Sequence, residues 1–165
     1  MGTCSLKVYL KKLEEDQMAA KILIADDHGI VRQGVRSLLE RQLDVEVVAE
    51  AEDSVEILLL IRKFKPDVVI IDGAISNFNE IGGVRQMLRK FPDIKVVVLS
   101  GQSVEEFVRG MFEAGICGYI LKDHLFEELV GAIKKVLEGG IYLSPSIRGV
   151  EVDDYVKHLA EDSKV

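Results

Sequence analysis

Short apolar runs alternate along the chain with segments whose apolar residues recur at helical spacing. The five runs, which begin at residues 21, 45, 67, 95 and 117, read KILIA, VEVVAEA, DVVIID, KVVVLS and CGYIL. Three of them are almost continuously apolar and rich in Val and Ile, which is typical of strands covered on both faces. Two of the intervening segments place aliphatic residues on one helical face: Val31, Val35, Leu38 and Leu39 in one, and Leu125, Leu129, Ile133 and Leu137 in the other.

Cap signals lie between the apolar runs. Asp53 with Glu56, and Ser103 with Glu106, have the three-residue offset of a capping box, so a helix is predicted to start at each pair. Strands that alternate with helices pair in parallel through right-handed crossovers. We therefore predict an α/β domain over residues 21–140, built as a doubly wound, five-stranded parallel sheet.

Two segments lie outside this domain. Residues 1–20 contain a possible short helix with three leucines on one face. Because Met18 stands just before the first strand, residues 1–17 are either a functional arm or an extension ahead of the native start. Residues 141–165 are polar, acidic and compatible with a helix, so we interpret them as a linker or an appended helix.

Composition and charge narrow the class of protein. A chain of 165 residues fits one domain with short extensions. Its formal net charge of -7 argues against a direct grip on a nucleic-acid backbone, which relies on Lys and Arg. Cys4 and Cys117 are too far apart in sequence to form a disulfide framework or a paired metal-ligand motif. No apolar run is long enough to span a membrane, and the N-terminus does not have the order of a signal peptide, so we expect a cytoplasmic protein without a membrane partner.

Polar side chains follow the predicted strands at the edge where open parallel sheets bind their ligands. Asp26 and Asp27 follow the first strand, Asp72 ends the third, Ser100 ends the fourth and Lys122 follows the fifth. A single acidic residue at a strand end indicates little, because strand ends meet water. The ordered set at successive strand ends indicates a functional site.

The three carboxylates among these strand-end residues would form a negatively charged site that a cation would stabilise. Three clustered carboxylates raise each other's pKa unless positive charge lies nearby, and Mg²⁺ is bound by such oxygens. Lys122 and Ser100 would stabilise further negative charge, such as a phosphoryl group. Since a carboxylate can itself act as a nucleophile and form an aspartyl-phosphate, the set predicts either a phosphoryl acceptor or a metal site without transfer.

With these residues in place, the chain resembles a receiver domain of two-component response regulators, and most closely that of the NarL/LuxR-type transcriptional regulators. The resemblance covers about residues 20–148 and is carried by ILIADDH, PDVVIID, VVVLSG and GYILKD. It implies a flavodoxin-like (CheY-like) sheet with strand order 2-1-3-4-5. It also implies a phosphorylation switch driven by a sensor histidine kinase, and not an enzyme that turns over outside substrates.

The resemblance assigns roles around the phosphoacceptor. Asp72 would take the phosphoryl group from a phosphohistidine of the kinase. Asp27 and Asp72 would bind Mg²⁺ directly, together with the backbone carbonyl of Ala74. Asp26 would act through a water molecule.

Further residues match the switch of the family. Ser100 stands at the hydroxyl position that bonds the phosphoryl oxygen, and Lys122 matches the lysine that pairs with the phosphate. Tyr119 matches the aromatic residue whose rotamer follows the switch, although an ordinary strand tyrosine would look the same. Gly101 is small, which fits a site that admits a phosphodonor, and it would equally serve a loop turn.

Some positions depart from the family pattern. Residues 73–76 read Gly-Ala-Ile-Ser, where the family usually has a hydrophobic residue, a variable one, Met and Pro, and Gly29 replaces a common proline. Glycine in place of proline frees the backbone, so we expect the loop that carries the Ala74 carbonyl to be less rigid. His28 is a further candidate ligand, ranked below the carboxylates because the family often has His there without a catalytic or metal role.

Regulators of this type continue into a helix-turn-helix domain, and none is recognisable before Val165. The segment VEVDDYVKHLA at residues 150–160 resembles the linker helix that precedes such a domain. The chain is therefore interpreted as cut before its output domain, with a natural stand-alone receiver as the alternative. In the first case DNA is reached only through the absent domain, and homodimerisation is a further implied interaction.

Two other functions remain open from the residues. A degenerate receiver that binds partners without phosphorylation is favoured by the altered loop at residues 73–76. A phosphatase of the haloacid dehalogenase type would use Asp26 as nucleophile and a second acid two residues later, where His28 stands. An FMN-binding flavodoxin is disfavoured, since the first strand-to-helix loop offers carboxylates where a phosphate needs donors.

Overall fold

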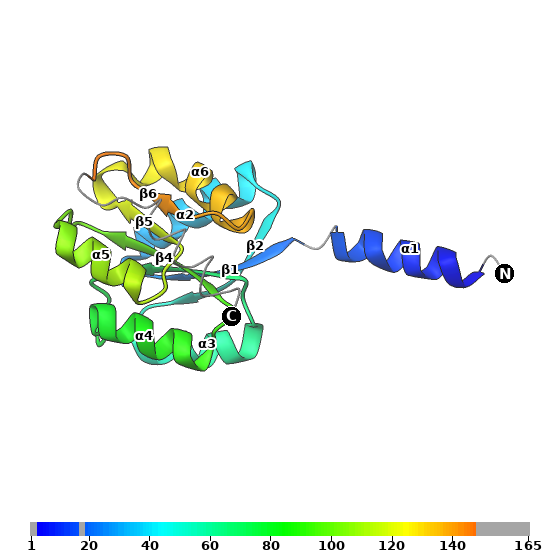
Figure 1. The fold of residues 1–165 in the computed structure, drawn as a ribbon, viewed down its shortest axis with the longest axis horizontal. Helices are drawn as coiled ribbons and strands as arrows, with labels where there is room; N and C mark the ends of the chain where they lie inside the picture. Colours follow the sequence, from blue (N-terminus) through cyan, green and yellow to red (C-terminus); the bar gives the residue numbers. More distant parts are fainter. Residues whose placement is uncertain (1–2, 17–18, 148–165) are drawn as a thin grey trace.

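The computed structural model, which describes residues 3–16 and 19–147, is a parallel sheet covered by helices on both faces (Figure 1). In chain order the elements are α1 (Thr3–Asp16), β1 (Ala20–Ala25), α2 (Gly29–Gln42), β2 (Val45–Ala51), α3 (Ser54–Phe64), β3 (Val68–Asp72), α4 (Glu80–Lys90), β4 (Lys95–Ser100), α5 (Glu105–Glu113), β5 (Gly118–Leu121), a 3₁₀ turn (Lys122–His124), α6 (Leu125–Leu137) and β6 (Tyr142–Leu143).

All pairings in the sheet are parallel, and the strand order is β2-β1-β3-β4-β5-β6. The predicted doubly wound fold and the order 2-1-3-4-5 are therefore confirmed. The sheet has one strand more than predicted, because Tyr142 and Leu143 pair with Gly118 and Tyr119 of β5. This short strand lies within the segment that the sequence assigned to a linker or an appended helix.

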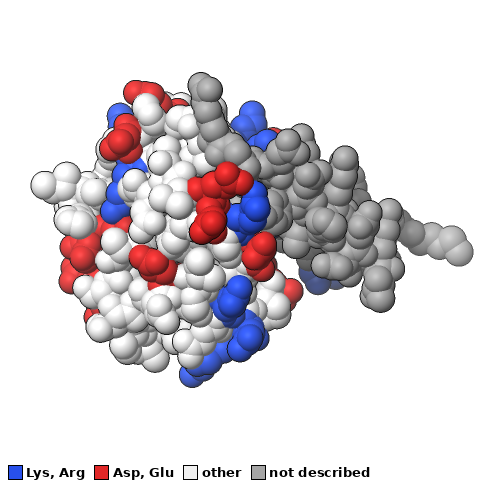
Figure 2. Space-filling model, turned by 60° about the vertical axis from the view of Figure 1, so that its left-hand side comes forward, with Lys and Arg blue, Asp and Glu red and all other residues white. Residues whose placement is uncertain are grey.

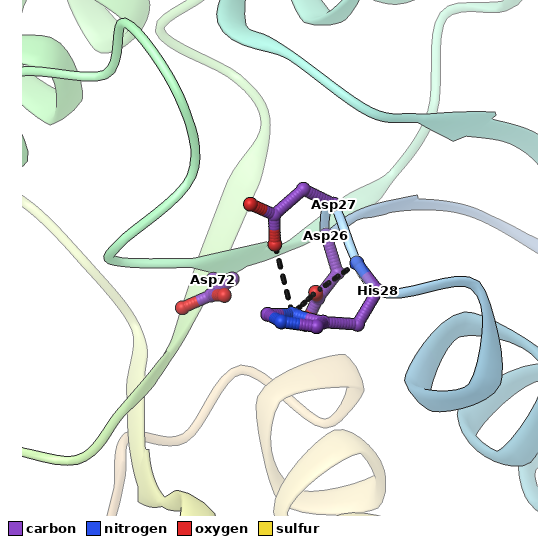
Figure 3. Close-up of side chains that lie close together, drawn as sticks. All are labelled: Asp26, Asp27, His28 and Asp72. Carbon is purple, nitrogen blue, oxygen red and sulfur yellow. Dashed lines mark hydrogen bonds and ion pairs between the residues drawn. The ribbon is translucent and has the colours of Figure 1, made fainter.

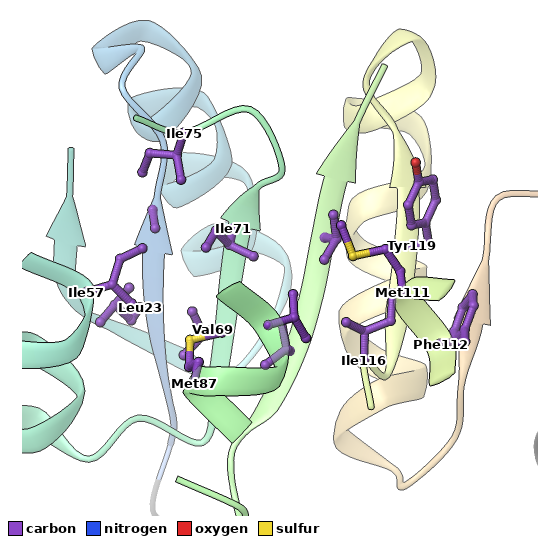
Figure 4. Close-up of a cluster of buried hydrophobic side chains, with 14 of the residues drawn as sticks. Leu23, Ile57, Val69, Ile71, Ile75, Met87, Met111, Phe112, Ile116 and Tyr119 are labelled. Atoms are coloured by element: carbon purple, nitrogen blue, oxygen red, sulfur yellow. The ribbon is translucent and has the colours of Figure 1, made fainter. Parts of the chain in front are cut away.

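The core has two halves, one on each side of the sheet. Helices α3, α4 and α5 cover one face, and α2 and α6 cover the other (Figure 1). Alternate residues of a strand enter opposite halves, as Leu23 and Ile24 of β1 do. Figure 4 shows the half under α3, α4 and α5, with Leu23, Ile71 and Met87 packed together. Because β3 is buried along its whole length, its C-terminal residue Asp72 is fixed by the core.

The helix faces follow the predicted spacing. Val35 and Leu39 of α2, and Leu129 and Ile133 of α6, are fully buried. Branched and aliphatic residues three and four positions apart thus form the stripe by which each helix packs on the sheet.

One of the two predicted caps is confirmed and the other is wrong. The Asp53 side chain accepts a hydrogen bond from the Glu56 N–H at the start of α3. Helix α5, in contrast, begins at Glu105 with Val104 at the cap position and no side-chain cap bond. Gln102 is instead bonded to Ser100 and Tyr119, which holds the β4–α5 loop outside the helix.

The helix predicted within residues 1–20 is formed as α1, which lies to one side of the domain beyond the N-terminal end of β1 (Figure 1). Leu6, Leu10 and Leu13 on its surface are exposed. Across the described ranges 3–16 and 19–147, no helix combines the length and apolar character needed to cross a membrane. The linker-like segment at residues 150–160 lies outside the described residues.

Candidate functional site

Three aspartates and one histidine meet at the carboxyl edge of the sheet. Potential ligand atoms of Asp26, Asp27, His28 and Asp72 all lie within 4.8 Å of one another (Figure 3). Asp26 and Asp72 are each 1% exposed, whereas Asp27 and His28 are open to solvent. The carboxylates predicted to cluster are therefore brought together, and His28 joins them.

The register of the sheet explains why these carboxylates meet. Ala25 of β1 is paired with Ile71 of β3, so the next residue on each strand, Asp26 and Asp72, comes side by side. The Asp26 N–H donates to the carbonyl of Ala51 at 3.0 Å, which extends the β1–β2 ladder up to the acid pair. The positions of both buried carboxylates are thus set by main-chain pairing.

Each buried carboxylate has one oxygen that lacks a hydrogen-bond partner within the described part of the chain. Oδ2 of Asp26 and Oδ2 of Asp72 are buried and accept no hydrogen bond from the described residues. Buried polar atoms are normally satisfied, and an isolated buried charge is costly. A divalent cation would satisfy both oxygens, and a set of carboxylate oxygens suits hard ions such as Mg²⁺. The residues present therefore fit a metal site.

His28 bridges the two acids of the first strand. Its Nδ1 lies 2.8 Å from Oδ1 of Asp27 and 3.0 Å from Oδ1 of Asp26, and its backbone N–H donates to Oδ1 of Asp26 at 2.8 Å (Figure 3). The ring is largely exposed, which leaves it in contact with solvent. Its observed contacts orient the acid pair from the solvent side.

Lys122 and Ser100 lie beside Asp72, in different relations to it. The Lys122 ammonium is 2.8 Å from Oδ1 of Asp72. Ser100 follows Leu99, the β4 residue paired with Asp72, so its hydroxyl lies at the neighbouring strand end. In this structure Ser100 Oγ accepts from the Gln102 N–H at 3.1 Å, within its own loop. The structure thus joins Lys122 to Asp72 directly and places Ser100 on the adjacent strand.

Tyr119 points inward and holds the same loop. Its ring is fully buried, and its hydroxyl donates to the carbonyl of Gln102 at 2.6 Å. Burial raises the pKa of the Tyr119 hydroxyl, so the neutral donor form is favoured. At Gly101, next to Ser100, an added Cβ would meet no atom of a residue beyond its two chain neighbours within 4 Å, so a side chain would fit there.

The loop after Asp72 is held by main-chain bonds despite its departures from the family pattern. The Gly73 N–H donates to the carbonyl of Leu99 at 2.9 Å, and the Ala74 N–H donates to Oδ1 of Asp72 at 3.0 Å. The Ile75 side chain is buried, and its N–H donates to the carbonyl of Asp72. These bonds place the Ala74 peptide against the acid cluster without a proline.

Arg32 is a site residue that the sequence reading missed. Its Nη1 donates to the carbonyl of Asp26 at 2.5 Å, and its Nη2 donates to Glu52 at 3.0 Å. The side chain is only 13% exposed, which is low for an arginine. The available signal was its spacing, since Arg32 lies three residues before Val35 and seven before Leu39, on the buried face of α2.

Two hollows of the surface lie away from the acid cluster. A groove of about 460 Å³ runs between α3 and α4, and a hollow of about 660 Å³ lies at the opposite edge of the sheet, beside Ala20 and Pro66. Neither includes a residue of the acid cluster. Within the described residues, the face in Figure 2 shows acidic and basic side chains interspersed, without a continuous basic stripe. Neither hollow therefore contributes to the acid cluster, whose own groups suit a cation.

The comparisons with known proteins agree with this geometry. The family model of the response regulator receiver domain matches residues 22–134. The transcriptional regulatory protein DegU of Brevibacillus brevis is 33% identical over 144 residues, which cover 87% of this chain and 61% of that protein. The response regulator GacA of Pseudomonas aeruginosa is 38% identical over 127 residues, which cover 77% of this chain and 59% of that protein. The chain thus spans about three-fifths of the length of these curated relatives.

Solved structures show the same likeness. The isolated receiver domain of RcsB from Salmonella enterica, determined with a phosphate-mimicking beryllium fluoride, matches with a TM-score of 0.73 and 27% identity, over 79% of this chain and 96% of that one. A LuxR-family two-component response regulator from Aurantimonas matches with a TM-score of 0.72 and 32% identity, over 90% of this chain and all of that one.

Proposed function

The chain belongs to the response regulator receiver domain family, and from this membership we propose that Asp72 accepts a phosphoryl group in a Mg²⁺-dependent switch. The observation that carries the proposal is the state of the Asp72 carboxylate. It is buried, its Oδ1 is held by Lys122 and Ala74, and its Oδ2 has no partner among the described residues.

The geometry supports attack by the Asp72 carboxylate on phosphorus. A new oxygen–phosphorus bond forms while the bond from phosphorus to the histidine nitrogen of a sensor kinase breaks, and the leaving imidazole keeps that electron pair. Lys122 lies where it neutralises charge on the aspartyl-phosphate. Phosphoryl transfer asks chiefly for positioning and charge neutralisation of this kind.

Mg²⁺ would be held by Asp27, Asp72 and the carbonyl of Ala74, with Asp26 acting through water. When bound, the ion supplies positive charge at the phosphoryl oxygens. His28 and Arg32 support this set, since His28 contacts both acids of the first strand and Arg32 holds the Asp26 peptide.

The switch would run through the β4–α5 loop. If the Ser100 hydroxyl turns to bond the phosphoryl group, it releases the Gln102 N–H that it now accepts from. The Gln102 carbonyl also holds the Tyr119 hydroxyl, so Tyr119 would sense the same movement. The relatives suggest two ways in which the switch would be read out: homodimerisation, or a DNA-binding domain outside this chain. A related structure is described as two RcsB dimers bound to two parallel DNAs.

Intact mass after incubation with Mg²⁺ and a small acyl phosphate tests the acceptor. We expect one phosphoryl adduct on the wild type, none on Asp72→Asn, and an unchanged adduct on Asp123→Asn, which alters an exposed carboxylate near the site. An adduct that persists in Asp72→Asn would refute the assignment. No adduct under any condition would favour a receiver that binds partners unphosphorylated, and steady hydrolysis of many phosphate esters would favour a phosphatase.

A further inference from the structure

Ser144 closes the sheet at the end of β5 in an unusual way. This serine is fully buried just after β6, and its backbone N–H donates to the carbonyl of Tyr119 at 3.0 Å. Its side-chain Oγ then accepts the Leu121 N–H at 2.9 Å. One residue therefore continues the strand pairing first with its main chain and then with its hydroxyl. The second of these bonds falls on the residue directly before Lys122.

Glu128 fixes the direction of that hydroxyl. Its Oε1 accepts a hydrogen bond from Ser144 Oγ at 2.7 Å and another from the Tyr142 hydroxyl at 2.7 Å. A serine hydroxyl has a single proton. Because Ser144 uses that proton to donate a hydrogen bond to the Glu128 carboxylate, a lone pair on its oxygen is left to accept from the Leu121 N–H. Burial and the bond to Glu128 raise the pKa of Tyr142, so its hydroxyl stays a donor.

The network encloses the turn that carries Lys122. Leu121 precedes the turn at residues 122–124, and Glu128 lies in the first two turns of the helix that follows it. Both are bonded to Ser144, so the serine ties the two ends of the turn together. The Ile147 N–H also donates to the Ser144 carbonyl at 3.0 Å, which holds the buried Ile147 close to this network.

We propose that Ser144, oriented by Glu128, is a positioning residue for Lys122. The inference rests on the proposed function of Asp72 and Lys122. The Lys122 ammonium must stay within hydrogen-bond reach of Asp72, now 2.8 Å, to neutralise the phosphoryl group. Displacing a positioned group by about 1 Å can lower a rate by about a hundredfold. Loss of the Ser144 bond frees the residue before Lys122 and lets the ammonium move.

The test is the rate of adduct formation by Ser144→Ala as the acyl phosphate concentration is varied. We expect the limiting rate to fall by roughly tenfold to a hundredfold. The Mg²⁺ concentration that gives half the rate is expected to fall, because the Asp72 carboxylate loses a competing positive charge when the Lys122 ammonium moves away. Ser144→Thr keeps a hydroxyl and is expected to restore most of the rate. Ser146→Ala, an exposed serine two residues on, serves as the matched control with the wild-type rate.

If Ser144→Ala does not fold, variants of Glu128 test whether the Glu128–Ser144 pair positions Lys122. Glu128→Leu removes the acceptor and is expected to slow the limiting rate, whereas Glu128→Gln keeps an oxygen acceptor and retains most of it. Tyr142→Phe leaves the Glu128–Ser144 bond in place and should match the wild type. Equal limiting rates for the wild type and Ser144→Ala, or for Glu128→Leu and Glu128→Gln, would overturn the inference about Ser144 and leave the proposed function of Asp72 intact. A wild type that forms no adduct on Asp72 would overturn the proposed function and the inference together.

Discussion

Asp72 uses its two carboxylate oxygens differently. Oδ1 accepts from the Ala74 N–H and faces the Lys122 ammonium, whereas Oδ2 is buried without a partner among the described residues. Hydrogen bonds to Oδ1 hold the carboxylate in one orientation. In the proposed function, the oxygen without a partner keeps its lone pairs for a metal ion or a phosphoryl group.

Asp26 tests the electrostatics of the cluster. Asp26→Asn removes a buried negative charge close to Asp27 and Asp72, so we expect the free energy of unfolding without divalent cations to rise by about 1–3 kcal/mol. Saturating Mg²⁺ should stabilise the wild type, by about 2.7 kcal/mol at a hundred times its Kd, and the variant much less. Urea unfolding with a chelator and with Mg²⁺ measures both. A variant less stable than the wild type in the chelator would contradict this reading, and Asp44→Asn, on the surface, is the control.

Gly73 tests whether the altered loop needs glycine. A Cβ at this position would meet Val98, Leu99 and Ser100 at 3.5–3.9 Å, which is ordinary contact, and its φ is not positive. We expect Gly73→Ala to raise the free energy of unfolding by about 0.4–1 kcal/mol, because the unfolded chain loses freedom.

Gly115→Ala provides the contrast for that experiment. Gly115 has a φ of +110°, and its added Cβ would lie 2.9 Å from Leu88. The same substitution is therefore expected to destabilise here, and urea midpoints of the two variants should move in opposite directions. A destabilised Gly73→Ala would mean that the loop relies on the freedom of glycine.

At the scale of elements, the sequence predicts best where a pattern is long and buried. The run that forms β3 is apolar at Val68, Val69, Ile70 and Ile71, and all of these are fully buried. Strand β6 has only two residues, too few for any periodicity, and its pairing depends on Ser144 and on contacts with α6. The short strand was therefore not predictable from the local sequence.

Local signals also fail where tertiary contacts compete with them. The spacing of Ser103 and Glu106 predicts a cap, yet α5 begins later, because Gln102 is bonded to Ser100 at the end of β4 and to Tyr119 of β5. The carboxylate cluster, in contrast, follows directly from parallel strands that end in aspartate. A side chain that reaches the site from a helix face, such as Arg32, is only weakly indicated by the sequence, through its spacing from the buried residues of the helix.

The bond between Tyr119 and Gln102 gives a test of the β4–α5 loop. Tyr119→Phe keeps the buried ring and loses one hydrogen bond, so we expect the free energy of unfolding to fall by about 0.5–1.5 kcal/mol. Amide hydrogen exchange should quicken at residues 100–104, which that bond steadies. Tyr9→Phe makes the same change on an exposed tyrosine of α1 and should alter neither quantity. Unchanged exchange in Tyr119→Phe would show that other contacts hold the loop.

Across the whole molecule, the site joins loops from both faces of the sheet. Asp26 and Asp27 precede α2 on one face, and Asp72 leads into α4 on the other. Lys122 precedes α6, which packs on the same face as α2. A phosphoryl group on Asp72, as proposed, would therefore adjoin loops that lead into both layers of helices.

One thiol and two phenols that are protected from solvent are expected to lower the stability of the folded protein at high pH. Burial raises the pKa values of Cys117, Tyr119 and Tyr142 above their ordinary values, which are 9.0 for the thiol and 10.0 for the two phenols. Between the ordinary and the raised pKa, the unfolded chain has lost protons that the folded chain keeps. The unfolded state then binds fewer protons, so the free energy of unfolding falls as pH rises.

We therefore expect the urea midpoint to be steady up to about pH 8.5 and to decline from about pH 9 upward. Cys117→Ala should make the decline shallower between about pH 9 and 10, since the thiol is the first of these groups to lose its proton in the unfolded chain. Tyr142→Phe should flatten the decline above about pH 10, whereas Tyr9→Phe, on an exposed tyrosine, should leave it as in the wild type. A decline that persists unchanged in both Cys117→Ala and Tyr142→Phe would contradict the assignment of the alkaline weakness to these buried groups.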